Sequence, residues 1–154
     1  MDVKEIVDKA VVSIADGAKL GYVRNVFFDP GGRLLTALEI QRDGERLVIP
    51  FQQINNLGAD AITVGQSQLV ATIAQPDWVA YDALKHRKVV DATGTLLGKV
   101  ERVQVEPATG VIQELTVHEG GILGLGGTTR TIPADAIRGF GAELITVTSA
   151  EPDA

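Results

Sequence analysis

Residues 16–40 read DGAKLGYVRNVFFDPGGRLLTALEI, and residues 93–117 read TGTLLGKVERVQVEPATGVIQELTV. In both copies a glycine, a leucine-glycine pair and spaced valines lead to an acidic residue before proline, and a second aliphatic run follows. Glycine and proline make specific demands on the backbone, so their coincidence at one shift, 93 − 16 = 77, is more informative than that of valines. The stretch therefore indicates an internal duplication.

The match continues on both sides of this stretch. Residues 10–41 lie over 87–118 at the shift of 77, which places Val12 opposite Val89. Further on, VIPFQQINNLGADAITV at residues 48–64 lies over TIPADAIRGFGAELITV at residues 131–147, at a shift of 131 − 48 = 83. The six additional residues, 83 − 77, fall in the segment that contains GGILGLGG, residues 120–127. We therefore expect an enlarged hairpin in the second copy.

Each copy is predicted to be a small barrel of five short strands. Aliphatic residues alternate over residues 33–41, the turn residues DPGG precede them, and Asp43-Gly44 is a hairpin signal. Because a 60-residue barrel buries a small fraction of its surface and is only marginally stable alone, the two copies should pack together as a pseudo-symmetric pair. The predicted fold is thus all-β, with the first repeat at residues 1–65, a connecting segment at 66–75, the second repeat at 76–150 and a tail at 151–154.

Helix is expected to be sparse. Residues 2–9 and 76–85 are predicted helices ahead of the two copies, the second with Asp77 as N-cap and with Trp78 directed into the core. Residues 51–57 and 133–137 are predicted to be single helical turns. The connecting segment contains Leu69, Val70 and Ile73, and we expect it to lie on the protein surface.

Composition limits the classes of partner. The chain carries 14 Lys and Arg against 20 Asp and Glu, a net charge of −6, which repels polyanions and disfavours direct binding of nucleic acid. There is no cysteine, and no apolar run approaches the roughly 20 residues of a membrane-spanning helix. We expect a cytoplasmic protein. The basic run Lys85-His86-Arg87-Lys88 is interpreted as a solvated helix end and strand start.

The repeat resembles the PRC-barrel family. The resemblance rests on four features that are present in both copies. These are the motif G-x-x-L-G-x-V, the turn with an acidic residue before proline, the Ile-Pro pair and the closing motif I-x-x-x-G-A-[DE]-x-I-T-V. The family includes the cytoplasmic domain of the photosynthetic reaction-centre H subunit and the C-terminal barrel of the ribosome-maturation factor RimM. The resemblance implies a binding or scaffolding barrel without a family active site.

No catalytic, cofactor or metal site is predicted. GGILGLGG lacks the lysine of a P-loop and the helix that a dinucleotide fingerprint requires, which leaves a glycine-rich turn or an interaction tip. His86 and His118, the two histidines, are assigned to the surface, and His118-Glu119 neighbours would point to opposite faces of a strand. The carboxylates and serines show no spacing that suits acid-base or nucleophilic catalysis.

The sequence therefore predicts a non-enzymatic protein that binds protein partners, with ribosome or RNA-processing assembly as the context that the resemblance suggests. Two alternatives stay open: a peripheral accessory of a membrane or photosynthetic electron-transfer complex, and a carrier of a small ligand in a cleft between the barrels. Association into homo-oligomers also stays open. The candidate partner-contact residues are Ile122, Leu123, Leu125, Arg130 and Trp78.

Overall fold

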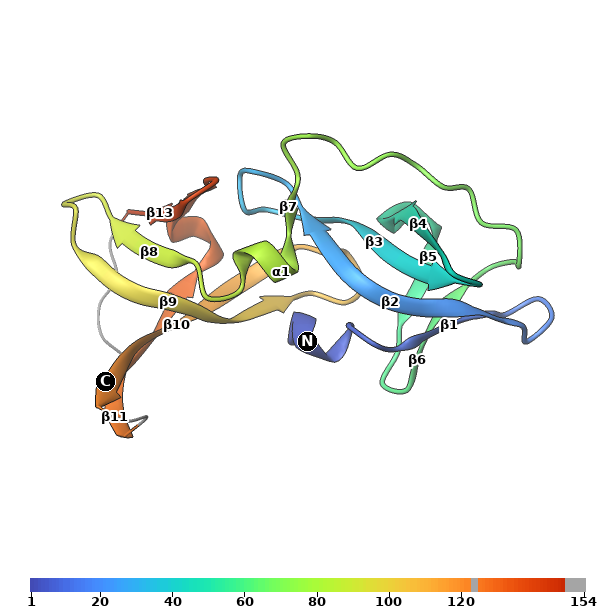
Figure 1. Cartoon of the computed structure of the whole chain (residues 1–154), viewed down its shortest axis with the longest axis horizontal. Helices are drawn as coiled ribbons and strands as arrows, with labels where there is room; N and C mark the ends of the chain where they lie inside the picture. The colour runs from blue at the N-terminus through green and yellow to red at the C-terminus, as the bar shows by residue number, and fades with distance from the viewer. Residues whose placement is uncertain (123–124, 149–154) are drawn as a thin grey trace.

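Two lobes of β-sheet lie side by side along the long axis of the molecule (Figure 1). The structure is a computed structural model that describes residues 1–122 and 125–148, with side chains described for residues 1–120 and 126–148. The strands of the first lobe are β1 (Ala10–Ser13), β2 (Lys19–Phe28), β3 (Leu35–Arg42), β4 (Glu45–Pro50), β5 (Ile54–Leu57) and β6 (Ala61–Val64). Those of the second lobe are β8 (Lys88–Asp91), β9 (Leu96–Val105), β10 (Ile112–Ile122), β11 (Leu125–Pro133), β12 (Ile137–Phe140) and β13 (Leu144–Val147).

The two lobes share one topology, which confirms an all-β fold built from a tandem repeat. The strand order is β4-β3-β2-β1-β6-β5 in the first sheet and β11-β10-β9-β8-β13-β12 in the second. In each lobe one pair is parallel, β1 with β6 and β8 with β13, and the other pairs in these two orders are antiparallel. The parallel pair joins the first and last strands of the copy, so it brings the ends of each repeat together.

Among the described residues, each repeat contributes six strands to its own sheet rather than the predicted five, and β7 (Val79–Ala80) adds a seventh strand to the first sheet. The helical turns predicted at residues 51–57 and 133–137 are only three residues long, as the 3₁₀ helices η2 (Phe51–Gln53) and η3 (Ala134–Ala136), and β5 and β12 follow them. Asparagine and glycine are depleted in strands, so Asn55-Asn56 in β5 and Gly139 in β12 give no strand signal. Pairing with β6 and β13 imposes the extended conformation instead.

The predicted alignment of the copies is wrong by one residue in the first strand. Val11 pairs with Gly21 and Val89 pairs with Gly98, so Val11 is the counterpart of Val89 and the shift there is 89 − 11 = 78. The sequence alignment placed Val12 in that position. The reason is that the turn between β1 and β2 is one residue longer than its counterpart, while the paired glycines set the strand register.

The predicted helices ahead of each copy are also much shorter than expected. Residues 2–9 contain η1 (Val3–Glu5), which Asp2 caps, and residues 76–85 contain β7 (Val79–Ala80) followed by α1 (Tyr81–Leu84). The residue before α1 is Ala80, which makes no side-chain capping bond, so the prediction of Asp77 as N-cap is wrong. The short helices η1 and α1 lie against the sheets. Backbone pairing of the neighbouring residues with the sheets takes the place of further helical hydrogen bonds.

The lobes meet through a reciprocal pair of backbone hydrogen bonds. The Leu35 amide donates to the Gly110 carbonyl at 2.8 Å, and the Ile112 amide donates to the Arg33 carbonyl at 2.8 Å. Because 112 − 35 and 110 − 33 both equal 77, each bond is the copy of the other under the repeat. Such isologous contacts are typical of a twofold axis between identical subunits. The chain therefore contains a pseudo-twofold dimer of its own halves.

Each sheet also receives a segment from the other half of the chain. β7 pairs with the end of β2 in the first lobe. Reciprocally, Asp2 forms a bridge with Gln104 of β9, and the Met1 ammonium donates to the Val105 carbonyl at 3.0 Å. The N-terminus consequently lies at the junction of the lobes (Figure 1). This exchange ties the folding of each lobe to the presence of the other.

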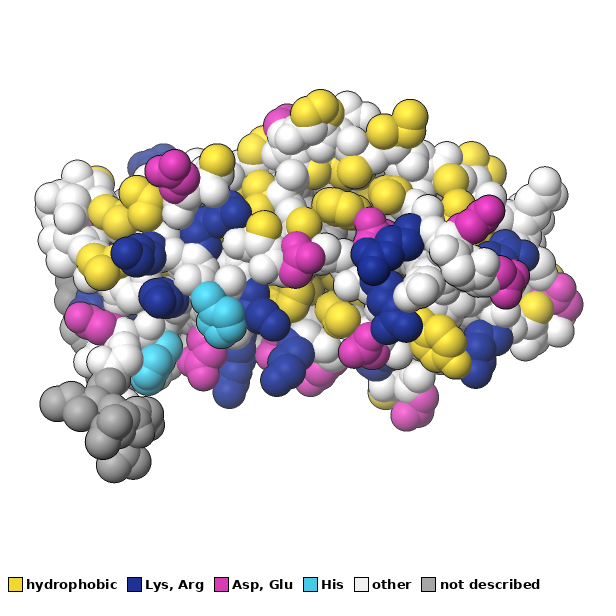
Figure 2. Space-filling view, in the orientation of Figure 1, with side chains coloured by type: hydrophobic (Ala, Val, Ile, Leu, Met, Phe, Trp, Pro, Cys, Tyr) yellow, Lys and Arg dark blue, Asp and Glu magenta, His cyan; other side chains and the backbone are white. Residues whose placement is uncertain are grey.

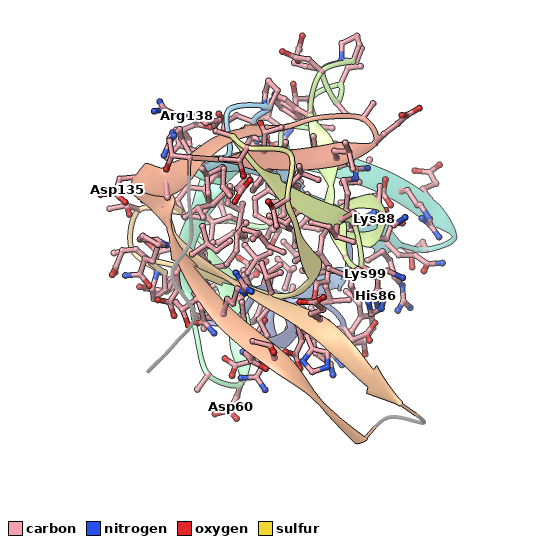
Figure 3. The ribbon with its side chains drawn as sticks, turned by 90° about the vertical axis from the view of Figure 1, so that its left-hand side faces the viewer. Asp60, His86, Lys88, Lys99, Asp135 and Arg138 are labelled. Carbon is pink, nitrogen blue, oxygen red and sulfur yellow. The ribbon has the colours of Figure 1, made fainter. Side chains whose placement is uncertain are left out.

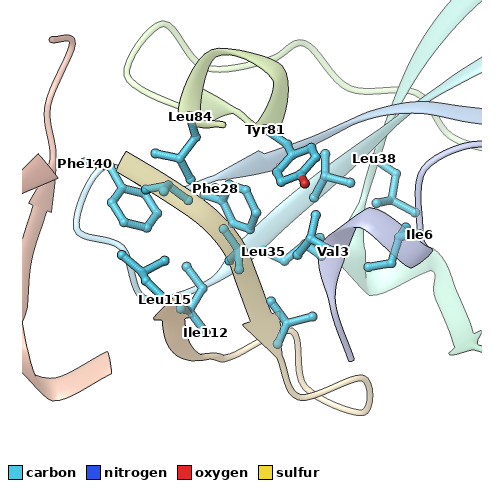
Figure 4. Packing of buried hydrophobic residues seen from close by; sticks show 14 of the residues in the cluster. Val3, Ile6, Phe28, Leu35, Leu38, Tyr81, Leu84, Ile112, Leu115 and Phe140 are labelled. Carbon is cyan, nitrogen blue, oxygen red and sulfur yellow. The ribbon is translucent and has the colours of Figure 1, made fainter. Parts of the chain in front are cut away.

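One hydrophobic core runs through both lobes (Figure 4). Phe28 of β2 and Phe140 of β12 are buried and meet edge to face, with ring centroids 6.0 Å apart. Val3 and Ile6 from the N-terminal segment and Leu84 from α1 are fully buried in the same cluster. The core thus includes the elements that the two halves exchange.

Arg33 fastens the junction on one side and provides a stability test. Its guanidinium donates to the carbonyls of Ala134 and Ile137 in the second lobe. Because much of Arg33 is exposed to solvent, we expect Arg33→Met to lower the free energy of unfolding by only about 1 kcal/mol. Arg33→Lys should recover less than half of this loss, since an ammonium lacks the planar fork that reaches two carbonyls. Urea denaturation measures both variants, and equal midpoints for Arg33→Met and the native chain would contradict the assignment.

Candidate functional site

The β10–β11 hairpin is the largest departure from the symmetry of the lobes. The first-lobe hairpin closes at Asp43-Gly44, beyond the pair Arg42↔Glu45. The second-lobe ladder continues past the corresponding pair, Glu119↔Thr128, through Gly120↔Gly127 to Ile122↔Leu125. Residues 120–127 were expected to form a turn, but strand pairing extends through most of them, and the hairpin projects from its lobe (Figures 1 and 3).

The glycines of this hairpin have a conformational role at its second strand. Gly126 and Gly127 have φ values of 76° and 99°, a region that other residues rarely adopt. They allow the ladder to reach the pair Ile122↔Leu125. Of the predicted contact residues, Leu123 and the side chains of Ile122 and Leu125 lie outside the described residues.

Arg130 lies at the base of the hairpin. It pairs with the buried Val117 and is itself half-buried, with an Nε atom that has no hydrogen-bond partner among the described residues. The hydroxyl of Thr93 and nearby backbone amides lower the pKa of Asp91, and the positive charge of Arg130 adds to this lowering. Arg130 therefore faces the body of the lobe.

Trp78 is half-buried at the junction, so the prediction that it fills the core is wrong. Its ring lies 6.0 Å from that of Phe27, centroid to centroid, at an angle of 40°. It lines a pocket of about 370 Å³ together with Leu34, Phe51 and Thr72. Tyr81 and Leu84 of α1, which were expected on the same side of the helix as Trp78, are buried in the core. Trp78 and the hairpin thus belong to separate surfaces.

A row of basic side chains crosses three strands of the second lobe. Lys88 on β8 pairs directly with Lys99 on β9, and Lys99 pairs directly with His118 on β10. Directly paired residues of antiparallel strands project from the same face of a sheet. His118 Nδ1 lies 3.2 Å from the Thr129 hydroxyl on β11, which continues the row. We call Lys88, Lys99 and His118 the cationic row.

The cationic row borders two adjoining hollows. One, of about 430 Å³, is bordered by the whole row and by His86, with Leu96 and Gly98 among its apolar lining. The other, of about 580 Å³, shares His86, Lys88 and Lys99 with the first. Figure 3 shows these three shared side chains on one side of the lobe, and Figure 2 shows both histidines among Lys and Arg side chains on one face. His86 is exposed, as predicted, whereas His118 is half-buried, and the structure brings both to a common hollow.

The equivalent row of the first lobe consists of residues with different chemistry. Its row reads Ala10, Tyr22, Gln41 and Arg46 across β1, β2, β3 and β4. The Lys19 ammonium donates to the Tyr22 hydroxyl at 3.0 Å and lowers the pKa of that phenol. Side chains of the lobe itself therefore satisfy one another here, whereas the corresponding row of the second lobe sets two lysines and a histidine side by side.

Sequence reasoning did not find the cationic row. Lys88 was interpreted as part of a solvated run, and no feature of the sequence linked it to residues 99 and 118. Only the register of strand pairing could have linked these residues, because the close approach of the strands at Gly98 aligns β8, β9 and β10. No pairing register between β8, β9 and β10 was predicted from the sequence, so the convergence of these three residues could not be derived.

The described residues contain no group of three or more His, Asp or Glu side chains placed to hold a metal ion. Within the same part of the chain, none of the helices has the length and hydrophobicity needed to cross a bilayer.

Two sheets of identical strand order, related by a pseudo-twofold axis within one chain, define a duplicated small-barrel protein. The chain belongs to the PRC-barrel domain family, whose sequence profile matches residues 1–69 and again residues 76–151. Both halves of the repeat are therefore family domains.

No curated protein matches the chain. Among solved structures, it is similar to one described as the 16S ribosomal RNA processing protein RimM of Pseudomonas aeruginosa. The similarity covers 94% of this chain and 96% of the other, with 17% sequence identity and a TM-score of 0.34. A likeness of this degree supports no inference about function.

Proposed function

We propose that this protein binds or scaffolds other proteins, rather than catalysing a reaction, and that the β10–β11 hairpin is its contact arm. The observation that carries the proposal is the extension of this hairpin to the pair Ile122↔Leu125, in a lobe whose topology otherwise repeats that of the first. An arm of paired strands offers backbone groups for strand addition by a partner as well as side chains. A barrel that needed only to close would end at a two-residue turn, as the first lobe does.

Ribosome or RNA-processing assembly is the context that we propose first, and membership of the PRC-barrel family is its support. A peripheral role at a membrane or photosynthetic complex is the alternative within the same family. One observation supports the other alternative, a carrier of a small ligand: the pocket of about 370 Å³ beside Trp78 at the junction of the lobes. The residues that line this pocket include no charged side chain, which suits an uncharged ligand better than an anion.

The hairpin proposal is tested by shortening the arm. Replacing residues 120–127 by Asp-Gly removes six residues and recreates the first-lobe turn. We expect tagged native protein to retain specific partners from its own lysate and the shortened protein to lose them, because the contact arm is gone. Leu123→Asp, which keeps the length, should weaken the same partners, and Asp43→Asn in the first-lobe hairpin is the matched control.

Mass spectrometry of the retained proteins, with and without ribonuclease, is the measurement. Ribosomal proteins that disappear with the shortened arm would support the assembly context. Partners that bind the native and shortened chains equally would show that the hairpin is not the contact.

A further inference from the structure

The cationic row carries an electrostatic cost that the fold does not require. Like charges placed directly opposite each other on neighbouring strands destabilise a sheet, and Lys88 and Lys99 are placed in this way. The first lobe has Ala10 and Tyr22 in the same two positions and keeps the same topology. The two lysines are therefore not needed for the barrel. Within the row, the two lysine ammonium groups and the imidazole of His118 have no carboxylate directly opposite them.

We propose that the cationic row binds a short acidic peptide segment of a partner protein. The carboxylates would lie over Lys88, Lys99 and His118, and an apolar side chain of the segment would enter the hollow of about 430 Å³ beside Leu96. Leu96 is 48% exposed in the free protein, so its coverage would remove apolar surface from water. The inference rests on the proposed protein-binding function for the nature of its ligand, and it concerns a surface separate from the hairpin tip.

The charges around the row favour a short ligand over a polyanion. Three carboxylates, Glu101, Glu119 and Glu143, border the two hollows, and Lys85 and Arg87 are the further cations beside them. The Arg87 guanidinium already donates to the Gly141 carbonyl. Because the whole chain has a net charge of −6, the surface around the row would repel a nucleic acid or an anionic bilayer. The few carboxylates of a short flexible segment can reach Lys88 and Lys99 with less repulsion from Glu101 and Glu119, which line the same hollow, than a polyanion would meet.

The test uses the full chain and a capped peptide, Asp-Glu-Leu-Asp, with Asn-Gln-Leu-Asn as the uncharged control of nearly the same shape. We expect the acidic peptide to shift the amide resonances of Lys88, Lys99 and His118 in NMR titrations. The uncharged peptide should leave them unchanged. Raising the ionic strength from about 0.05 M to 0.5 M should weaken the binding, because exposed charges are screened.

The variant that tests the row carries the first-lobe residues in the second lobe, Lys88→Ala with Lys99→Tyr. Its affinity for the acidic peptide should fall about tenfold, the combined effect of two exposed ion pairs. The control variant, Lys4→Ala with Arg42→Ala, also removes two exposed positive charges and should bind as the native chain does. Lys88→Ala alone should raise Tm by about 1–2 °C through relief of the lysine repulsion, a readout that is independent of any ligand.

Three results would overturn the proposal. These are absence of peptide binding to the native chain, equal binding by the native chain and the row variant, and row-dependent binding of a single-stranded oligonucleotide or an anionic vesicle in place of the peptide. The hairpin-shortened protein keeps all three residues of the row and, apart from Gly120, every residue that lines the hollow of about 430 Å³, so it separates the two proposals. If it still binds the acidic peptide but loses no lysate partner, the hairpin proposal fails and the row stands.

Discussion

Phe28→Ala is expected to destabilise both lobes at once, with a loss of about 3–5 kcal/mol in the free energy of unfolding. Phe28 is fully buried in the first lobe, and its ring contacts Phe140 of the second. Truncation leaves a cavity where the two halves of the core join, and neither half can close it without shifting a strand. For a chain of this length, Tm should fall by roughly 10 °C.

The shape of this transition is as informative as its midpoint. Because the core is continuous and the lobes exchange their edge segments, calorimetry should show one transition in both the native and the variant protein. Phe27→Ala is the control, since Phe27 is the next residue along β2, half-buried, and packs on Trp78 at the surface. Its effect should be less than half as large. Two separate transitions, with only one displaced by Phe28→Ala, would show that the lobes fold independently.

Gly98→Ala is the second large effect that we expect. A Cβ atom at this position would lie 2.6 Å from the carbonyl oxygen of His118 and 2.9 Å from the amide nitrogen of Glu119. Both atoms belong to the backbone of β10 and cannot rotate away, and φ at Gly98 is 136°. The expected loss is about 3 kcal/mol or more in the free energy of unfolding, from steric strain and an unfavourable backbone conformation.

Gly94→Ala is the matched control, because Gly94 also has a positive φ, 84°, but a Cβ there meets nothing within 4 Å. It should cost about 1 kcal/mol, the backbone term alone. Gly98→Ala should also displace the amide resonances of Lys99 and His118, since the substitution forces β9 and β10 apart at the cationic row. A Gly98→Ala protein as stable as Gly94→Ala would show that the strands tolerate the added methyl group.

Much of the fold could be predicted because it depends on short-range signals. The alternation at residues 33–41 and the hairpin at Asp43-Gly44 each depend on a few adjacent residues, and both were found close to their observed places. The pseudo-symmetric packing also followed from the small size of each barrel. The strands β5 and β12 were missed because their residues have no intrinsic strand preference and are held extended by a neighbour.

The candidate site was predictable only in part. The six-residue enlargement of the hairpin is a property of the alignment and was placed correctly. The interpretation of Trp78 as a core residue failed because α1 is a single turn, preceded by β7, which pairs with the other lobe. The two histidines were assigned to the surface, but nothing in the sequence indicated that they share a hollow.

The amino-acid sequence was sufficient to determine the duplication, the strands with alternating aliphatic residues and the glycines that allow close approach. These features depend on short segments, in which each residue's own backbone preference decides its conformation. The tertiary structure alone decided which residues face one another across strands and across the two lobes. Lys88, Lys99 and His118 meet because pairing aligns three strands, and Leu35 meets Gly110 because the halves associate about a pseudo-twofold axis. These contacts join residues far apart in the chain, so their geometry follows from the register of strand pairing and not from any one segment.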